Sequence, residues 1–336
     1  MKKGILACLL LAVVLIASSC SSGKSANSGE SASLKKVKVM LDWFPNTNHT
    51  GIYAAKEKGY YKKEGLDVEI VEPGEGTSTD QVVAAGKADY GISYQENITQ
   101  ARSNGIPLVS IGAIIQENTS AFASLKKDGI ASPKDFEGKR YGGWGAPTEE
   151  AVLNAVMKKN GADPGKVKNV TLGATDFFQS IGRDADFEWI YYGWDGIEAE
   201  RKGIKLNYIF LKDLDPALNY YTPVIAASEK KIKEDKETTA KFMKATSLGY
   251  QFAINHPEDA ADLLIKQVPD INADLVKKSQ KWISSQYQGK AEVWGQQKEE
   301  VWKKYADWMF ERKLIKENID ASKAYTNEFL PKDSTD

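Results

Sequence analysis

Apolar and polar positions alternate along the first half of the chain in patterns that predict strands and helices in turn. KVKVMLDW at 36–43 and LDVEIVEP at 66–73 have the two-residue period of strands, and residues 50–65 between them have helical spacing that ends at Gly65. The pattern continues with a capped helix at 78–87, a strand at 88–94, a strand-like segment at 139–145, a helix at 148–161, strands at 168–173 and 186–194, and a helix at 195–203.

This alternation of strands and helices predicts mostly parallel sheets, whose ligands lie beyond the carboxyl ends of the strands. Four segments therefore become candidates for a binding site: Asp42–His49, Tyr94–Asn97, Trp144–Thr148 and Tyr191–Asp195.

Two short stretches resemble each other. AAGKADYGISY at 84–94 and IGRDADFEWIYY at 181–192 each run from a helix end through a turn with Gly and a basic residue into an aromatic strand. The similarity fits two lobes built on one plan, which the length of the chain also favours, because 336 residues exceed the usual size of a single core.

The last third of the chain has the spacing of helices over 238–267 and 298–315, and NHPED at 255–259 predicts a helix–helix turn within the first of these segments. Trp302, Tyr305 and Met309 follow one another at helical spacing, so we expect them on one buried face. The formal net charge is −1 and no basic block occurs, which argues against nucleic acid as a partner.

The first residues have the pattern of an export signal. Two lysines precede an apolar run from Ile5 to Ala17, too short to span a membrane, and LIASSC ends it at Cys20 like a bacterial lipobox. We therefore expect a signal peptide over 1–19, lipid attachment at Cys20, a flexible tether over 20–35 and a place on the outer face of the cell membrane. The alternative is an ordinary signal with an incidental cysteine.

A specific motif then identifies a family. LDWFPNTNHTGIYAAKEKGYYKKEGLDVEI, with GKADYGISYQE and SPKDFEGKRYGGWG, closely resembles solute-binding proteins of ABC importers, and among them binders of the thiamin precursor N-formyl-4-amino-5-aminomethyl-2-methylpyrimidine. The resemblance implies a two-lobed α/β periplasmic-binding fold of type II, with lobe I over 36–120 and 226–336 and lobe II over 121–225. It places the crossovers near Asn118–Ser124 and Tyr221–Ala227.

The same family contains fungal enzymes that make the thiamin pyrimidine. In them a histidine of the matching Asn-His-Thr-Gly stretch is consumed with pyridoxal phosphate, and a cysteine-rich motif accompanies iron. This chain has His49 at that place but lacks the cysteine cluster, so the resemblance favours a binding protein over an enzyme.

An aminopyrimidine is a flat polar ring, so its site should combine aromatic faces with hydrogen-bonding groups at the ring edge. We expect the ligand contacts to be Asp42, Trp43, Asn46, His49, Tyr94, Glu96, Trp144, Glu188, Tyr191 and Trp194. Each aromatic could instead pack between the lobes.

The polar candidates also have local alternatives. Asp42 and Asn46 could cap a turn, and Thr148 is the expected cap of the helix at 148–161. Glu198 has the spacing of a capping box with Asp195.

We therefore predict a monomeric solute-binding protein that closes by a hinge and delivers its ligand to an ABC permease and ATPase, without a catalytic residue, cofactor or metal. Another small solute, such as a sulfonate or nitrate, is the alternative ligand. A pyrimidine synthase and a purely structural lipoprotein are the alternative classes.

Overall fold

The computed structural model describes residues 33–332 apart from 75 and 174, and the chain from Leu34 onward forms one unit. The expected signal peptide, Cys20 and most of the tether lie outside the described residues. Among the described helices, none is both long enough and apolar enough to cross a membrane.

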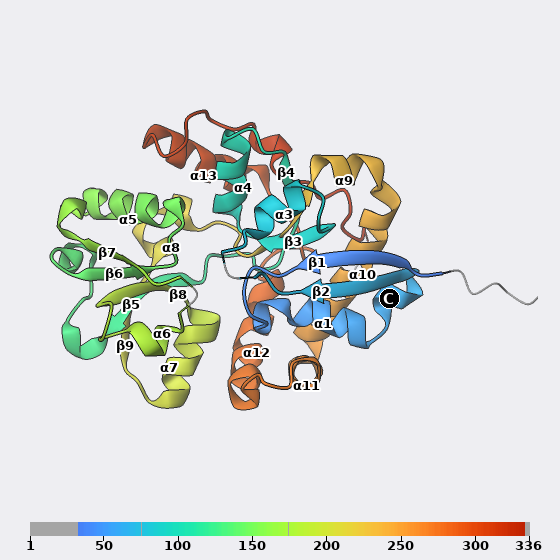
Figure 1. Cartoon of the computed structure of the whole chain (residues 1–336), viewed down its shortest axis with the longest axis horizontal. Coiled ribbons are helices and arrows are strands. Elements are labelled where there is room, and N and C mark those ends of the chain that lie inside the picture. Colours follow the sequence, from blue (N-terminus) through green and yellow to red (C-terminus); the bar gives the residue numbers. More distant parts are fainter. Residues whose placement is uncertain (1–32, 75, 174, 333–336) are drawn as a thin grey trace, which may run out of the picture. The chain divides into compact units, whose positions relative to one another are not determined.

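Five strands form the first sheet, in the order β2-β1-β3-β10-β4 (Figure 1). Strand β1 is parallel to β2 and to β3, whereas β10 is antiparallel to both of its neighbours. The strands are β1 (Lys35–Met40), β2 (Leu66–Val71), β3 (Tyr90–Ser93), β4 (Leu108–Ala113) and β10 (Val224–Ser228).

The second sheet repeats this plan in the order β7-β6-β8-β5-β9, with β5 as the antiparallel strand. Its strands are β5 (Ser120–Leu125), β6 (Arg140–Gly143), β7 (Lys168–Thr171), β8 (Phe187–Tyr191) and β9 (Leu206–Phe210). The two similar stretches of sequence contain β3 and β8, which hold the third place in their sheets. In each sheet the reversed strand is the first one formed after the chain crosses from the other sheet.

The chain passes from the first sheet to the second between Ala113 and Ser120, and returns between Phe210 and Val224. These connections bring β10 into the middle of the first sheet from more than 100 residues away along the chain.

Two of the predicted helical segments are interrupted. Residues 50–65 form α1 (Thr50–Glu57) and α2 (Tyr60–Lys63), because Gly59 between them has a positive φ of 72°. Residues 238–267 form α10 (Lys236–Asn255) and α11 (Pro257–Gln267), since Pro257 has no N–H to continue α10 and begins the next helix instead.

The remaining helices flank the sheets or follow them along the chain. They are α3 (Thr79–Ala84), α4 (Gln95–Ser103), α5 (Pro147–Lys159), α6 (Phe177–Ser180), α7 (Ile197–Lys202), α8 (Leu211–Leu214), α9 (Glu229–Glu234), α12 (Ala273–Gln288) and α13 (Glu299–Glu311).

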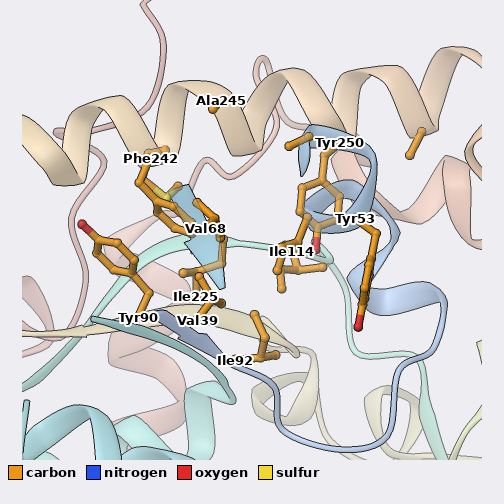
Figure 2. Packing of buried hydrophobic residues seen from close by; sticks show 14 of the residues in the cluster. Val39, Tyr53, Val68, Tyr90, Ile92, Ile114, Ile225, Phe242, Ala245 and Tyr250 are labelled. Carbon is orange, nitrogen blue, oxygen red and sulfur yellow. The ribbon is translucent and has the colours of Figure 1, made fainter. Parts of the chain in front are cut away.

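The core of the first sheet lies beneath α10. Figure 2 shows Phe242 and Tyr250 on one side of this helix, above Val39 and Ile225 of the sheet. The ring of Phe242 stacks on Tyr90 of β3 at a centroid distance of 4.1 Å, so α10 and the first sheet enclose one packed core.

Helix α13 contacts two cores. Tyr305 and Met309 belong to the cluster under the second sheet, which also contains Phe122, whereas Trp302 belongs to a cluster with Val224 of the first sheet. All three predicted core residues of this helix are fully buried, which confirms their assignment. The lobe boundaries remain a prediction.

Candidate functional site

Asp42 lies two residues beyond the end of β1, where its carboxylate meets side chains from two other segments. Oδ1 lies 2.7 Å from Nε2 of His49, and Oδ2 accepts a hydrogen bond from the Tyr94 hydroxyl at 2.5 Å. Tyr94 directly follows β3, the strand next to β1, so the parallel register brings these side chains to the same sheet edge.

The hydrogen bonds of His49 fix its tautomer. Nδ1 accepts the backbone N–H of Asn46 at 3.1 Å, so this nitrogen carries no proton and Nε2–H donates to Asp42. The imidazole is fully buried and both of its nitrogens have partners within the chain. In this arrangement His49 orients the Asp42 carboxylate and has no unpaired ring nitrogen.

Opposing effects act on the pKa of Asp42. Burial alone raises the pKa of this carboxyl, but the facing His49 ring and the hydrogen bonds from His49 and Tyr94 lower it by more, so it lies below its ordinary value. Each carboxylate oxygen accepts up to two hydrogen bonds, so Asp42 can still accept a donor from a ligand.

Asn46 makes the local contacts of a turn residue. Its Oδ1 accepts the N–H of Asn48 at 2.9 Å and its Nδ2 donates to the carbonyl of Phe44 at 3.0 Å. The side chain thereby caps the 3₁₀ turn Thr47–His49, which favours the capping interpretation of this residue.

Two helices far along the chain donate hydrogen bonds to the turn Thr47–His49. Tyr250 of α10 donates to the carbonyl of Asn48 at 2.7 Å, and Tyr287 of α12 donates to the carbonyl of Thr47 at 2.5 Å. The sequence did not single out either tyrosine, because nothing local connects them with residues 46–49.

Tyr191, at the end of β8, contacts a residue that follows a strand of the first sheet. Its ring stacks on Tyr94 with a centroid distance of 6.1 Å and an interplanar angle of 15°, and its hydroxyl lies 3.4 Å from Oγ1 of Thr222. Burial, together with the nearby Glu96 and Asp42, raises the pKa of Tyr191 well above its ordinary value, so the hydroxyl keeps its proton.

Three exposed aromatic residues lie on the loops after β1 and β6. Trp43 and Trp144 are each 36% exposed and Phe44 is 59% exposed. Trp43 packs edge-on against Phe44, and Trp144 packs against Trp189 at a centroid distance of 5.4 Å. Exposed rings of this size on two equivalent loops are suited to covering a flat ligand.

Glu96 is buried in the first turn of α4. Burial raises its pKa to about 8, so the carboxyl is largely protonated at neutral pH. Within the described part of the chain, Glu96 Oε2 and the hydroxyls of Tyr220 and Tyr305 are buried without a hydrogen-bond partner. These groups come from three separate segments, and only Glu96 was recognisable from the sequence.

Glu188 and Trp194 are placed differently from the residues around Asp42. Glu188 accepts a hydrogen bond from the Ser180 hydroxyl at 2.7 Å, and burial raises its pKa to about 7. Trp194 packs against the core of the first sheet, as its alternative interpretation expected. Between residues 33 and 332, no described hydrogen bond or ring contact joins either side chain to Asp42, Tyr94 or Tyr191.

The first turn of α5 contains a buried acid, Glu149, that the sequence did not single out. Glu149 accepts hydrogen bonds from the Tyr141 hydroxyl at 2.8 Å and from the backbone N–H groups of Trp144, Gly145 and Ala146 at 2.7–3.1 Å. Burial nevertheless raises its pKa. The signal for this role was its position three residues after Ala146, the spacing of a capping box.

Two capping predictions were wrong. Helix α5 begins at Pro147, so Thr148 lies within its first turn and Ala146 holds the cap position. Glu198 binds the Arg201 guanidinium with an O–N distance of 2.6 Å, and Gly196 holds the cap position of α7.

No three histidine, cysteine, aspartate or glutamate side chains of the described residues lie where they could hold a metal ion.

The candidate site comprises Asp42, His49, Tyr94 and Tyr191, with Trp43 and Trp144 on the adjoining loops.

Comparison with known proteins supports the predicted fold. The chain is similar to the alkanesulfonate-binding protein SsuA from Xanthomonas axonopodis pv. citri bound to MOPS, with a TM-score of 0.67 and 13% identity over 88% of this chain and 99% of that one. Together with the two mixed sheets flanked by helices, this similarity confirms the two-lobed α/β periplasmic-binding fold.

The sequence relatives include both binding proteins and synthases. The chain is 28% identical to the formylaminopyrimidine-binding protein of Halalkalibacterium halodurans, over 95% of this chain and 97% of the relative. It is 26% identical to the 4-amino-5-hydroxymethyl-2-methylpyrimidine phosphate synthase of Legionella pneumophila, over 89% and 94% respectively. Because residues 46–260, more than half of the chain, also match the family described as NMT1/THI5 like, the protein belongs to that family.

Proposed function

We propose that the protein is the solute-binding component of an ABC importer and that it binds a formylated aminopyrimidine precursor of thiamin. Ligand binding would close the two lobes about a hinge and present the closed form to the permease and its ATPase. No chemical step is required.

One observation carries the proposal: Asp42 is hydrogen-bonded to Tyr94, whose ring stacks on Tyr191 of the other sheet. A carboxylate beside aromatic faces suits an exocyclic amine on a flat ring, since the carboxylate accepts the amine protons while the rings contact the face. The name of the relative from H. halodurans supports the same ligand class.

Isothermal titration calorimetry with N-formyl-4-amino-5-aminomethyl-2-methylpyrimidine tests the proposal. We expect saturable binding of one ligand per chain, and native mass spectrometry of the purified protein should detect the same compound if it co-purifies. Failure to bind this pyrimidine, together with binding of another solute, would overturn the ligand assignment.

An anionic solute is the first alternative. Sulfonate or nitrate would be expected to meet Arg or Lys, whereas Asp42, His49, Tyr94, Tyr191 and the loop tryptophans include no cation in the tautomer described above. Competition calorimetry with an alkanesulfonate and with nitrate should leave pyrimidine binding unchanged.

A synthase that consumes His49 is the second alternative, which the name of the relative from L. pneumophila keeps open. The burial of His49 and the use of both of its ring nitrogens favour a structural role over consumption. After incubation with pyridoxal phosphate and iron under aerobic conditions, we expect an unchanged intact mass, and a loss of mass at His49 would establish the synthase.

We further propose a monomer that is anchored through lipid on Cys20 to the outer face of the cell membrane, with lobe I over 36–120 and 226–336 and lobe II over 121–225. Fractionation tests the anchor: Cys20→Ala should move the protein from the membrane pellet to the soluble fraction. Retention of the variant in the membrane would remove lipidation from the proposal.

A further inference from the structure

Ser279 of α12 connects the turn that holds His49 with the second sheet. Its hydroxyl donates to the carbonyl of Gly193, in the π-helical turn Tyr192–Gly196 that follows β8. The same oxygen lies 2.6 Å from Oγ1 of Thr47. Since Ser279 gives its only proton to Gly193, the Thr47 hydroxyl is the donor of this second bond.

This short chain of hydrogen bonds begins at the candidate site. Thr47 and His49 lie in one 3₁₀ turn, and His49 holds Asp42. Ser279 is fully buried, so water does not compete for its bonds with Thr47 and Gly193. Ser279 therefore joins the turn to the strand end after β8 by two buried hydrogen bonds, in addition to the stacking of Tyr94 on Tyr191.

Side-chain packing brings α12 close enough for this bond. A Cβ atom at residue 193 would lie 2.9 Å from Trp282 and 3.4 Å from Ile283, so only glycine allows the backbone to approach α12 so closely. Next to this contact, the rings of Trp282 and Tyr192 lie 5.1 Å apart, and Trp194 packs on the first core.

We propose that Ser279 is a positioning residue that couples the His49 turn to the strand end after β8 and thereby stabilises the arrangement of the two sheets in which these bonds form. Resting on the proposed function, the inference adds that this serine slows the release of the pyrimidine. It does not require Ser279 to touch the ligand.

The test compares Ser279→Ala with Ser284→Ala. Ser284 lies on the same helix and is also buried, but its hydroxyl bonds only the carbonyl of Ala253 in α10 and the carbonyl and side-chain amide of Gln280 in α12. Both variants lose a buried hydroxyl of the same size, so only the connection to the second sheet distinguishes them.

Two measurements are made on each variant, with Cys20→Ala added so that the protein is recovered in the soluble fraction. Small-angle X-ray scattering without ligand reports the balance of open and closed forms, and stopped-flow fluorescence reports dissociation of the pyrimidine. We expect Ser279→Ala to increase the ligand-free radius of gyration and to raise the dissociation rate about 3- to 10-fold, the effect of one buried hydrogen bond. Ser284→Ala should leave both values near those of the parent.

Gly193→Ala provides a second variant, because its added methyl group separates the π-helical turn from Trp282 and should change both measurements in the same direction as Ser279→Ala. Unchanged scattering and dissociation in Ser279→Ala, or equal changes in Ser284→Ala, would overturn the inference. If the parent binds no pyrimidine, the proposed function fails. The radius of gyration of ligand-free Ser279→Ala, compared with that of the parent, still tests the role of Ser279.

Discussion

Strands β1 and β6 hold the second place in their sheets, and each is followed by a buried acid: Asp42 in the loop after β1, and Glu149 in the first turn of α5 after β6. Asp42 is held by two side chains, His49 and Tyr94, of which Tyr94 lies 52 residues away along the chain. Glu149 is held by Tyr141 and by three backbone N–H groups of the loop that precedes α5.

The two carboxylates differ in the number of hydrogen-bond donors that the chain supplies to them. Four donors satisfy the carboxylate of Glu149, so this residue fixes the loop and the start of α5. Asp42 has one donor on each oxygen and can accept more. Acids that follow corresponding strands of the two sheets therefore differ in how many of their hydrogen-bonding sites the chain itself fills.

The largest expected effect is on stability. Glu149→Ala leaves the buried Tyr141 hydroxyl and three partly buried N–H groups without an acceptor, so we expect the free energy of unfolding to fall by about 3–5 kcal/mol. Urea denaturation measures this change, with the exposed neighbour Glu150→Ala as the control. A loss as small as that of Glu150→Ala would remove the structural role of Glu149.

The pH dependence of stability should differ in sign between the two acids. The pKa of Asp42 is lowered from 3.8, so its ionised form stabilises the fold above this value and the contribution disappears as the pH falls through the native pKa. The pKa of Glu149 is raised from 4.5, so its contribution falls as the pH rises above 4.5 toward the native pKa.

Denaturation of Asp42→Asn and Glu149→Gln from pH 3 to pH 8 tests this sign. Relative to the parent, we expect the destabilisation by Asp42→Asn to shrink at the acidic end and that by Glu149→Gln to shrink toward neutral pH. Parallel pH profiles for the two variants would contradict the difference between the acids.

Ligand recognition should depend on Asp42. We expect Asp42→Asn to weaken binding of the aminopyrimidine by about 1–3 kcal/mol, because the amine loses a charged acceptor. An analogue without the amino group should lose less affinity in the same titration. Equal losses for both ligands would assign Asp42 to the turn, as Glu149 is.

The loop tryptophans extend the comparison to ring contacts. We expect Trp43→Ala and Trp144→Ala each to reduce affinity by about 1–2 kcal/mol, the range of a buried aromatic contact. Only Trp144→Ala should also lower the melting temperature, since its ring packs on Trp189. Calorimetry and thermal denaturation of both variants measure these effects, and an unchanged affinity removes the residue from the site.

The smallest effect should separate the two bonds of His49. Gln at this position can present an amide N–H where Nε2 lies, whereas Asn can present an acceptor where Nδ1 lies. We therefore expect His49→Gln to bind the ligand nearly as the parent does, and His49→Asn to lose about 0.5–1.5 kcal/mol of affinity because Asp42 is released. The opposite order would show that the turn, and not Asp42, is what His49 supports.

Sequence patterns predicted most strands and helices, because their signals are local. The strand at 66–73, the Ser78-capped helix and the buried face of Trp302 and Met309 all follow from period and capping residues. The break at Gly59 was missed because apolar spacing continues across it, and the reversed strand β10 leaves no local sign of its partners.

The candidate site was predictable in part. Asp42 and Tyr94 follow neighbouring parallel strands of the first sheet, so their proximity could be expected from the alternating pattern. The stacking of Tyr191 on Tyr94 could not, because Tyr191 ends β8 of the second sheet and the pattern does not say how the two sheets meet. Glu188 and Trp194 come from the same kind of segment, but whether a strand residue faces a site or a core depends on what packs against it.

By itself, the sequence determined the fold class, the family motif and the residue types available at the strand ends, since period, turn residues and side-chain chemistry are properties of neighbouring positions. Tertiary structure alone decided that His49 serves Asp42, that Glu149 serves its loop and that Ser279 reaches Gly193. These roles depend on burial and on hydrogen-bond partners from distant segments, and a buried polar atom takes whichever partner the packed chain brings within about 3 Å.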